Sequence, residues 1–192
     1  MVKDGIMDWI LASASPRRKQ LLGELLEKFE IVPAKGEENA GEAVTPEETV
    51  KALARQKAEE VASLPLANGK AVLGADTVVA YGNEILGKPK DEADAARMLA
   101  LLSGKWHEVY TGVCIVLPDG RAFVDADYTK VRFFLLSAAQ IQAYIKTGSP
   151  MDKAGAYGIQ DGGLVERIEG SFSNVVGLPV ELCKQMIENL QK

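Results

Sequence analysis

The segment 71–80 limits the fold most strongly, because it has the composition of a buried β-strand and carries one carboxylate, Asp76, near its middle. Burying an ionised carboxylate without a partner is costly, so Asp76 requires a metal ion, a basic side chain or hydrogen-bond donors. Gly74 and Ala75 precede it, and residues this small would allow a ligand to approach the backbone closely. The alternative is an aspartate that simply ends a strand. The first interpretation predicts a functional site at Asp76.

Strand-like and helix-like segments alternate along the rest of the chain. Helix starts are indicated where Pro16 follows Ser15 and where Glu48 follows Thr45 by three residues. The residues PDG at 118–120 separate two β-rich runs and predict a hairpin. We expect strands at 9–12, 29–33, 71–81, 84–86, 109–117, 121–134 and 164–168, and helices at 16–27, 46–63, 92–102, 137–146 and 179–190. This alternation predicts a mixed α/β fold in a single domain over residues 1–192.

The charge balance and the cysteine spacing exclude several classes of protein. The net charge of −5 argues against broad attraction to nucleic acid or to anionic membranes. No apolar run approaches the ~20 residues that span a bilayer, and residues 1–8 lack the apolar core of a secretory signal. Cys114 and Cys183 lack CxxC spacing, so we expect them to be buried and reduced, as in the cytoplasm. His107 is the single histidine, with no cysteine or second histidine to form a zinc site and no serine elbow motif, so we expect a structural role and neither zinc nor serine-triad chemistry.

Two hydroxyls and two arginines occupy a predicted strand-to-helix turn, in which Ser13 and Ser15 precede Arg17 and Arg18. A helix N-terminus favours bound anions, and guanidinium groups hold phosphate in a bidentate manner. The turn is therefore a candidate triphosphate site. An N-cap followed by two solvated arginines is the alternative.

Two lysines occupy positions that suit phosphate contact. Lys57 lies on the apolar stripe of the helix predicted at 46–63, seven residues after Val50. A lysine there must extend to solvent, pair with an acid or bind an anion. Lys88 lies in the proline-stiffened turn GKPKD at 87–91, which also fits an ordinary surface loop.

An amide and two acids complete the set of candidates. Gln160 ends the small-residue segment DKAGAYGIQ at 152–160, where the backbone could approach a ligand and the amide could hydrogen bond to the edge of a base. Glu37 and Glu38 lie in the polar loop 35–45 and offer hard oxygen ligands for Mg²⁺. A solvated acidic loop is the alternative for these two residues.

Taken together, these segments resemble the Maf family over residues 11–190. Each motif is weak alone, but their order along the whole chain is specific. The motifs are LASASPRR at 11–18, KA at 57–58, LGADTVV at 73–79, GKP at 87–89, LSGKWH at 102–107, YTGV at 110–113 and DKAGAYGIQ at 152–160. The resemblance implies a Maf fold related to that of the inosine triphosphatases, with a bent mixed sheet and flanking helices that form two lobes around a deep cleft.

The resemblance also implies a role for each matching residue. Asp76 matches the catalytic proton acceptor, and Glu38 and Asp76 match the ligands of a divalent metal cation, Mg²⁺ or Mn²⁺. The substrate-binding positions of the family match Ser13, Arg18, Lys57 and Lys88, and the positions that bear on base preference match Arg17, Thr77 and Gln160. The residues GEE at 36–38 depart from the usual Val-Asp-Glu-like stretch, so Glu37 stays an alternative to Glu38. A carboxylate that ligates a metal is a weak base, so the two roles of Asp76 compete.

The set of specificity residues is similar to that of the dTTP/UTP branch of the family. The resemblance therefore implies an enzyme that hydrolyses dTTP and UTP to the nucleoside monophosphate and pyrophosphate. The alternatives are the same cleavage of modified or non-standard nucleotides such as 7-methyl-GTP, and a nucleotide-binding regulator of septum formation. The expected partner is a nucleoside triphosphate in the cytoplasm, without nucleic acid or membrane, and a homodimer is left open.

Overall fold

The structure is a computed structural model that describes residues 7–190. The chain divides into two compact units. The first unit comprises Met1–Asp76, Thr111–Asp127 and Gly177–Lys192, and the second comprises Thr77–Tyr110 and Tyr128–Val176. Each unit has a hydrophobic core of its own.

The first unit begins with parallel strands joined through helices. Strand β1 (Asp8–Leu11) pairs in parallel with β2 (Glu30–Ile31) and with β3 (Lys70–Tyr81). Helix α1 (Pro16–Leu22) lies between β1 and β2 in the chain, and helix α2 (Pro46–Ala62) and the 3₁₀ turn η1 (Pro65–Ala67) precede β3. The register aligns Leu11 with Leu73, and the Ala12 N–H donates to the Leu73 carbonyl at 2.8 Å. The chain therefore leaves β1 beside the middle of β3, a few residues before Asp76.

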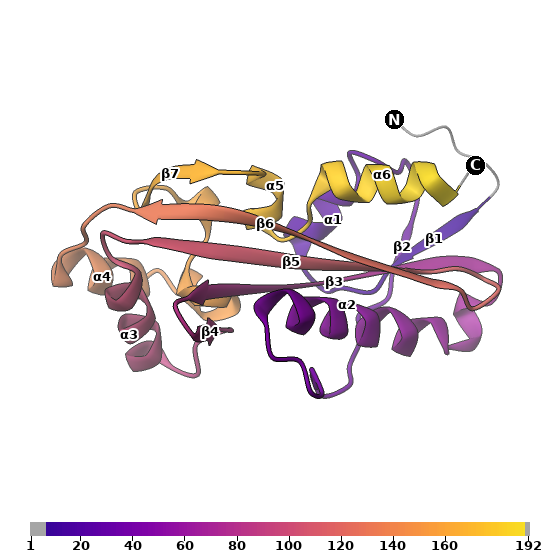
Figure 1. Ribbon diagram of the computed structural model, residues 1–192, viewed down its shortest axis with the longest axis horizontal. Coiled ribbons are helices and arrows are strands. Elements are labelled where there is room, and N and C mark those ends of the chain that lie inside the picture. Colours follow the sequence, from indigo (N-terminus) through magenta and orange to yellow (C-terminus); the bar gives the residue numbers. More distant parts are fainter. Residues whose placement is uncertain (1–6, 191–192) are drawn as a thin grey trace. The chain divides into compact units, whose positions relative to one another are not determined.

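Helix α2 packs closely on the strands of the first unit. A Cβ atom at Gly74 of β3 would lie 2.5 Å from the Ala54 carbonyl oxygen, and one at Gly112 of β5 (Trp106–Val116) would lie 2.3 Å from that of Val50. Figure 1 shows α2 along one side of these strands and α6 (Val180–Leu190) along the other. The α2 face, β1, β3 and β5 share a core that contains Ile10, Ala12, Ala54, Ala58, Val61, Ala67, Val72, Cys114 and Val116.

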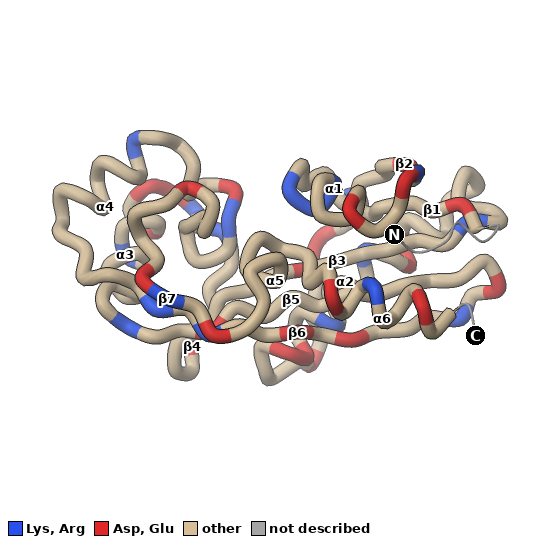
Figure 2. The backbone as a smooth tube through the Cα atoms, turned by 90° about the horizontal axis from the view of Figure 1, so that it is seen from above, with Lys and Arg blue, Asp and Glu red and all other residues tan. Residues whose placement is uncertain are grey.

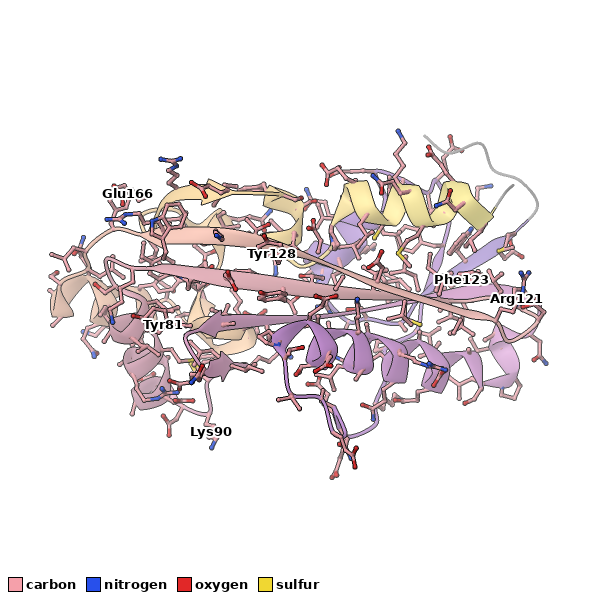
Figure 3. All side chains as sticks on the ribbon, viewed as in Figure 1. Tyr81, Lys90, Arg121, Phe123, Tyr128 and Glu166 are labelled. Carbon is pink, nitrogen blue, oxygen red and sulfur yellow. The ribbon has the colours of Figure 1, made fainter. Side chains whose placement is uncertain are left out.

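The turn between β5 and β6 (Ala122–Phe133) is the predicted hairpin. The Leu117 N–H donates to the Arg121 carbonyl at 2.8 Å, and the Gly120 N–H donates to the Leu117 carbonyl at 2.9 Å. Figure 3 labels Arg121 and Phe123 at this end, where the guanidinium carbon lies 5.9 Å from the centre of the phenyl ring. The hairpin prediction is confirmed.

The second unit surrounds a larger apolar core. Its elements are β4 (Glu84–Leu86), α3 (Glu92–Leu102), α4 (Ala138–Ile145), the 3₁₀ turns η2 (Ser149–Asp152), η3 (Ala154–Ala156) and η4 (Ile159–Asp161), β7 (Val165–Glu169) and α5 (Phe172–Val176). Strand β4 pairs antiparallel with the end of β3, and β7 pairs antiparallel with β6. Phe133, Leu99 and Leu102 are fully buried in this core.

The strand order β2-β1-β3-β5-β6-β7, with β4 on β3, contains parallel and antiparallel pairs. This arrangement confirms the prediction of a mixed α/β sheet with flanking helices. The two lobes around a deep cleft stay a prediction. Among residues 7–190, no helix combines the length and apolar character needed to cross a membrane.

Some predicted boundaries are wrong. Helix α1 ends at Leu22 and not at residue 27, because the chain changes at Gly23 to three-residue turns such as the Leu25 N–H to Leu22 carbonyl bond of 3.0 Å. Glycine is a poor helix former, which favours an end at this position. Strand β5 begins at Trp106, three residues earlier than expected, and α5 and the 3₁₀ turns were not predicted. Cys114 and Cys183 are free and buried, as expected.

Candidate active site

Asp76 is a buried acid with a basic partner. Its residue is 7% exposed within β3, and one of its carboxylate oxygens, Oδ1, accepts a hydrogen bond from the Lys57 ammonium. The same ammonium lies 2.9 Å from Oε1 of Glu38. Of the three possibilities for a lysine on the apolar stripe of α2, the structure therefore shows pairing with acids. Asp76 does not end the strand, since β3 continues to Tyr81.

The packing of helix α2 on β3 brings Lys57 to Asp76. Its start is fixed by a capping box, in which the Thr45 hydroxyl accepts from the Glu48 N–H and the Glu48 side chain accepts from the Thr45 N–H. Ala58 packs directly on Gly74 of β3, and Lys57 is the residue before it in the helix. The Lys57 side chain is only 16% exposed, so its charge faces the acids and not the solvent.

The loop that carries Glu38 is fastened to α2 by two side chains. Gln56 donates to the Glu37 carbonyl at 2.7 Å and accepts from the Asn39 N–H at 3.0 Å. Glu60 accepts from the Lys35 N–H at 2.7 Å. Glu38 in this loop pairs with Lys57, and which of Glu37 and Glu38 would hold a metal stays a prediction. Gln56 and Glu60 are not among the residues predicted from sequence, and no local signal marks them, because their partners lie in the loop and not on α2.

The turn after β1 places polar groups at the edge of the same unit. The Ser15 hydroxyl caps α1 by accepting from the Arg18 N–H at 3.4 Å. The buried Ser13 hydroxyl accepts from the Ser15 N–H at 3.2 Å and lies 3.5 Å from Nη1 of Arg18. Figure 2 shows the basic stretch at the start of α1, which contains Arg17 and Arg18. The turn is ordered by its own hydrogen bonds.

Arg18 is held in place and influenced by both acids. Its Nε donates to the Gly177 carbonyl at 2.8 Å, across 159 residues of sequence. Burial lowers the pKa of Arg18, and the attraction of Asp76 and Glu38 opposes that shift. An arginine side chain nevertheless keeps its charge in a protein. Ser13 and Arg18 lie beside each other, and Glu38, Lys57 and Asp76 form one ion-pair cluster; all five residues belong to the first unit.

The other predicted site residues belong to the second unit. Thr77 follows Asp76 on β3 and is partly buried, while Lys88 and Gln160 are exposed. The Gly155 N–H donates to the Gly87 carbonyl at 3.0 Å, so the turn that carries Lys88 is bonded to the segment that ends at Gln160. That these three residues join those of the first unit in one site stays a prediction.

The small residues of two motifs serve packing inside the protein. We expected Gly74 to admit a ligand, but the space beside it is filled by the backbone of α2. A Cβ atom at Gly155 would lie 2.7 Å from Cγ2 of Val79, so this glycine admits a side chain of β3. The interpretation of Gly74 as a point of ligand approach is therefore wrong, and an approach of a ligand to the segment 152–160 stays a prediction.

His107 has the structural role that was expected. It is 3% exposed, its Nε2 lies 2.9 Å from the Tyr157 hydroxyl, and its ring packs edge-to-face on Phe133 and Tyr157. Burial lowers the pKa of His107 to about 4, so the imidazole is neutral at physiological pH. It anchors Tyr157, which precedes Gln160 in the same motif.

The donor set suits a hard divalent cation. Glu38 and Asp76 meet at one positive charge, the Lys57 ammonium, and both offer only oxygen. Across residues 7–190, no three His, Cys, Asp or Glu side chains are grouped as metal ligands. A pair of carboxylates completed by substrate phosphates and water is the usual set for Mg²⁺, which is rarely enclosed by protein alone.

Comparison with known proteins gives consistent matches over nearly the whole chain. Residues 8–190 match the family described as Maf-like protein. A dTTP/UTP pyrophosphatase of Agathobacter rectalis is 50% identical, with 94% of this chain and 96% of that protein covered. Proteins with the same name from Aquifex aeolicus and Thermococcus gammatolerans are 48% and 49% identical, with 94% and 93% of this chain and 94% and 95% of theirs covered.

A solved structure with a similar fold is that of the Staphylococcus aureus Ham1 protein. The TM-score is 0.54, with 95% of this chain and 99% of that chain covered. The sequences are only 14% identical, so this likeness concerns the fold alone.

Proposed function

The chain belongs to the Maf family, and from this premise we propose that it is a nucleoside triphosphate pyrophosphatase that hydrolyses dTTP and UTP to the nucleoside monophosphate and pyrophosphate. Relatives that carry this name share about half of their residues with this chain over more than nine-tenths of its length. The observation that carries the chemistry is the buried Asp76 carboxylate, which shares the Lys57 ammonium with Glu38.

The charged and polar residues predicted for the site each have a task in this reaction. Lys57 engages Oδ1 of Asp76, which leaves Oδ2 to accept a proton from the attacking water. A divalent cation held by Glu38 and Asp76 would neutralise phosphate charge and polarise the α-phosphate. Arg18 and the Ser13 hydroxyl bind phosphate oxygens, and Lys57 and Lys88 stabilise the negative charge of the departing pyrophosphate.

Gln160 reads the base in this proposal. Its exposed side-chain amide offers one donor and one acceptor. Uracil and thymine share an N3–H donor beside carbonyl acceptors, whereas cytosine presents an unprotonated N3. Arg17 and Thr77 supply further donors toward the sugar and phosphates, and neither distinguishes strongly between ribose and deoxyribose.

The test is a comparison of kcat/KM for dTTP, UTP, CTP, ATP, GTP and 7-methyl-GTP by release of pyrophosphate. We expect dTTP and UTP to be the best substrates, and Gln160→Ala to reduce their advantage over CTP. The matched control is Gln142→Ala on an exposed position of α4, which should leave the ranking unchanged. A purine or 7-methyl-GTP as the best substrate would contradict the substrate assignment, and binding without turnover would favour a regulator.

The metal is tested separately. Hard oxygen ligands and a polyphosphate substrate require a divalent cation, so activity should be lost in EDTA and restored by Mg²⁺ or Mn²⁺. Isothermal titration of Mn²⁺ into the protein with a non-hydrolysable dTTP analogue provides a readout other than turnover. Glu38→Gln should weaken this Mn²⁺ binding, and Glu37→Gln should leave it unchanged.

A further inference from the structure

The exposed turn that carries Gln160 is held on both sides by one hydroxyl group. Gln160 lies in η4, between Gly158 and Asp161. The Tyr144 hydroxyl accepts a hydrogen bond from the Gly158 N–H at 3.0 Å and donates one to Oδ2 of Asp161 at 2.5 Å. Tyr144 comes from α4, 14 residues before Gly158 in the chain. A single side chain thus fixes the backbone before Gln160 and the side chain after it.

The Asp161 carboxylate is the centre of a continuous chain of hydrogen bonds. Oδ2 of Asp161 also accepts from the Ser149 hydroxyl at 2.6 Å, and that hydroxyl in turn accepts from the Lys153 ammonium at 2.8 Å. The Lys153 side chain is only 10% exposed and also donates to the Ser149 carbonyl at 2.5 Å. Burial and the Asp161 carboxylate raise the pKa of the Tyr144 hydroxyl, so it stays a donor. The Tyr144 and Ser149 hydroxyls each accept one hydrogen bond and donate another, and bonds linked in this way polarise and strengthen one another.

The segment before the turn is held equally firmly. Ala156 has a φ of 61°, the single positive value among the non-glycine residues of the described chain. A backbone conformation of this kind persists only where its surroundings determine it. Tyr157 is buried against His107 and Phe133, and a Cβ atom at Gly158 would lie 2.7 Å from the Lys153 side chain. By contrast, the turn is followed by Gly162 and Gly163, both with positive φ.

We propose that Tyr144 is a positioning residue for base selection, which acts through Asp161 and Gly158 to hold in place the backbone that carries the Gln160 amide. This inference rests on the proposed function. Selectivity by a side-chain amide requires that its donor and acceptor meet the base in a fixed order, and a turn that is free to move would let the amide adjust its position to either pyrimidine. The Tyr144 hydroxyl orders the turn before the substrate binds, so binding does not lose the conformational entropy of the turn.

The test measures the ratio of kcat/KM for UTP to that for CTP in Tyr144→Phe, which keeps the ring and removes the hydroxyl. Because the hydroxyl bonds to a charged carboxylate and a backbone N–H at once, we expect the ratio to fall by about tenfold or more. The kcat for UTP should change little, because Tyr144 bonds to none of the residues proposed to act on the phosphates. The matched control is Tyr81→Phe, at the end of β3 and labelled in Figure 3. The centre of the Tyr81 ring lies 4.9 Å from Nζ of Lys105. Removing the hydroxyl there should leave the ratio unchanged.

A double-mutant cycle separates positioning from a general structural role. In the Gln160→Ala background, adding Tyr144→Phe should leave the ratio unchanged, because the group that Tyr144 positions is absent. Asp161→Ala should reproduce the loss seen in Tyr144→Phe, and Asp161→Asn, which keeps an acceptor oxygen, should restore part of it. An equal loss of activity on every nucleotide, or a further fall of the ratio without Gln160, would overturn the inference.

The outcomes also separate this inference from the proposed function. If the unaltered protein prefers UTP to CTP and Tyr144→Phe keeps that preference, the positioning role is wrong and the function stands. If the unaltered protein shows no preference for uracil or thymine nucleotides, both are wrong.

Discussion

The region around Asp76 and the region around Gln160 are ordered in different ways. Asp76 lies on a strand and Lys57 on a helix, and the two are brought together by backbone-to-backbone packing at Gly74. Gln160 lies on a short 3₁₀ turn that side-chain hydrogen bonds from Tyr144, Ser149 and Lys153 hold in place. The groups proposed for bond cleavage thus depend on the fold itself, and the group proposed for selection depends on a few replaceable side chains. We expect changes in the first region to cost turnover or stability, and changes in the second to cost selectivity.

The largest effect is expected for Asp76→Asn, which removes the proposed base and keeps the size of the side chain. General acid–base catalysis contributes at least about 100-fold to the rate, so kcat for dTTP should fall by that factor or more. Pyrophosphate release measures it, and circular dichroism checks the fold. Near-normal turnover in the folded variant would show that the chemistry depends on another residue.

The next effect concerns the stability of the first region. Lys57→Met keeps the apolar stem and leaves the buried Asp76 carboxylate without its ammonium partner. Breaking one side of a buried ion pair costs about 3 kcal/mol or more in the free energy of unfolding. Urea denaturation measures this, and the double variant Lys57→Met/Asp76→Asn should recover part of the loss. If the double variant is no more stable than Lys57→Met alone, the buried charge is not the cause.

A pH dependence is expected from the second region. Burial lowers the pKa of His107 from an ordinary 6.5 to about 4 in the folded protein, so between these values the unfolded chain binds the proton first. Stability therefore falls as the pH falls from about 6.5 towards 4, by about 2 kcal/mol at pH 5. Comparing urea denaturation of the unaltered protein and His107→Gln, which does not titrate, isolates this contribution. Parallel pH profiles for the two proteins would contradict it.

The smallest effect compares two glycines that face different obstacles. A Cβ atom at Gly74 meets the Ala54 carbonyl at 2.5 Å and the Ala58 nitrogen at 2.8 Å, both backbone atoms that cannot move aside. At Gly158 the obstacles are the side chains of Lys153 and Asp161, which can shift. Overpacking costs about 1 kcal/mol or more, so Gly74→Ala should reach this value and Gly158→Ala should cost less. Thermal unfolding measures both, and a larger loss in Gly158→Ala would reverse the comparison.

The residues around Asp76 could be predicted from sequence better than the residues that hold the turn at Gln160. Asp76 and Lys57 stand out because each breaks an apolar pattern, on a strand and on a helix, and the elements that carry them are found where the patterns place them. Gln56 and Glu60 look like ordinary exposed helix residues, and their bonds to the loop at 35–39 depend on tertiary contact. Tyr144 gives no local signal, because its partners Gly158 and Asp161 lie in another segment. The prediction that a ligand approaches Gly74 is wrong, because a glycine gives the same free space beside a strand to a packed helix as to a ligand.

The products formed from dTTP with Mg²⁺, followed by ³¹P NMR, show most directly which phosphate bond is cleaved. We expect dTMP and pyrophosphate in equal amounts, because the water activated by Asp76 is proposed to attack the α-phosphate. We also expect both products to be lost in Asp76→Asn and kept in the control Gln142→Ala. Formation of dTDP and inorganic phosphate, or unchanged product formation by Asp76→Asn, would contradict the proposed reaction.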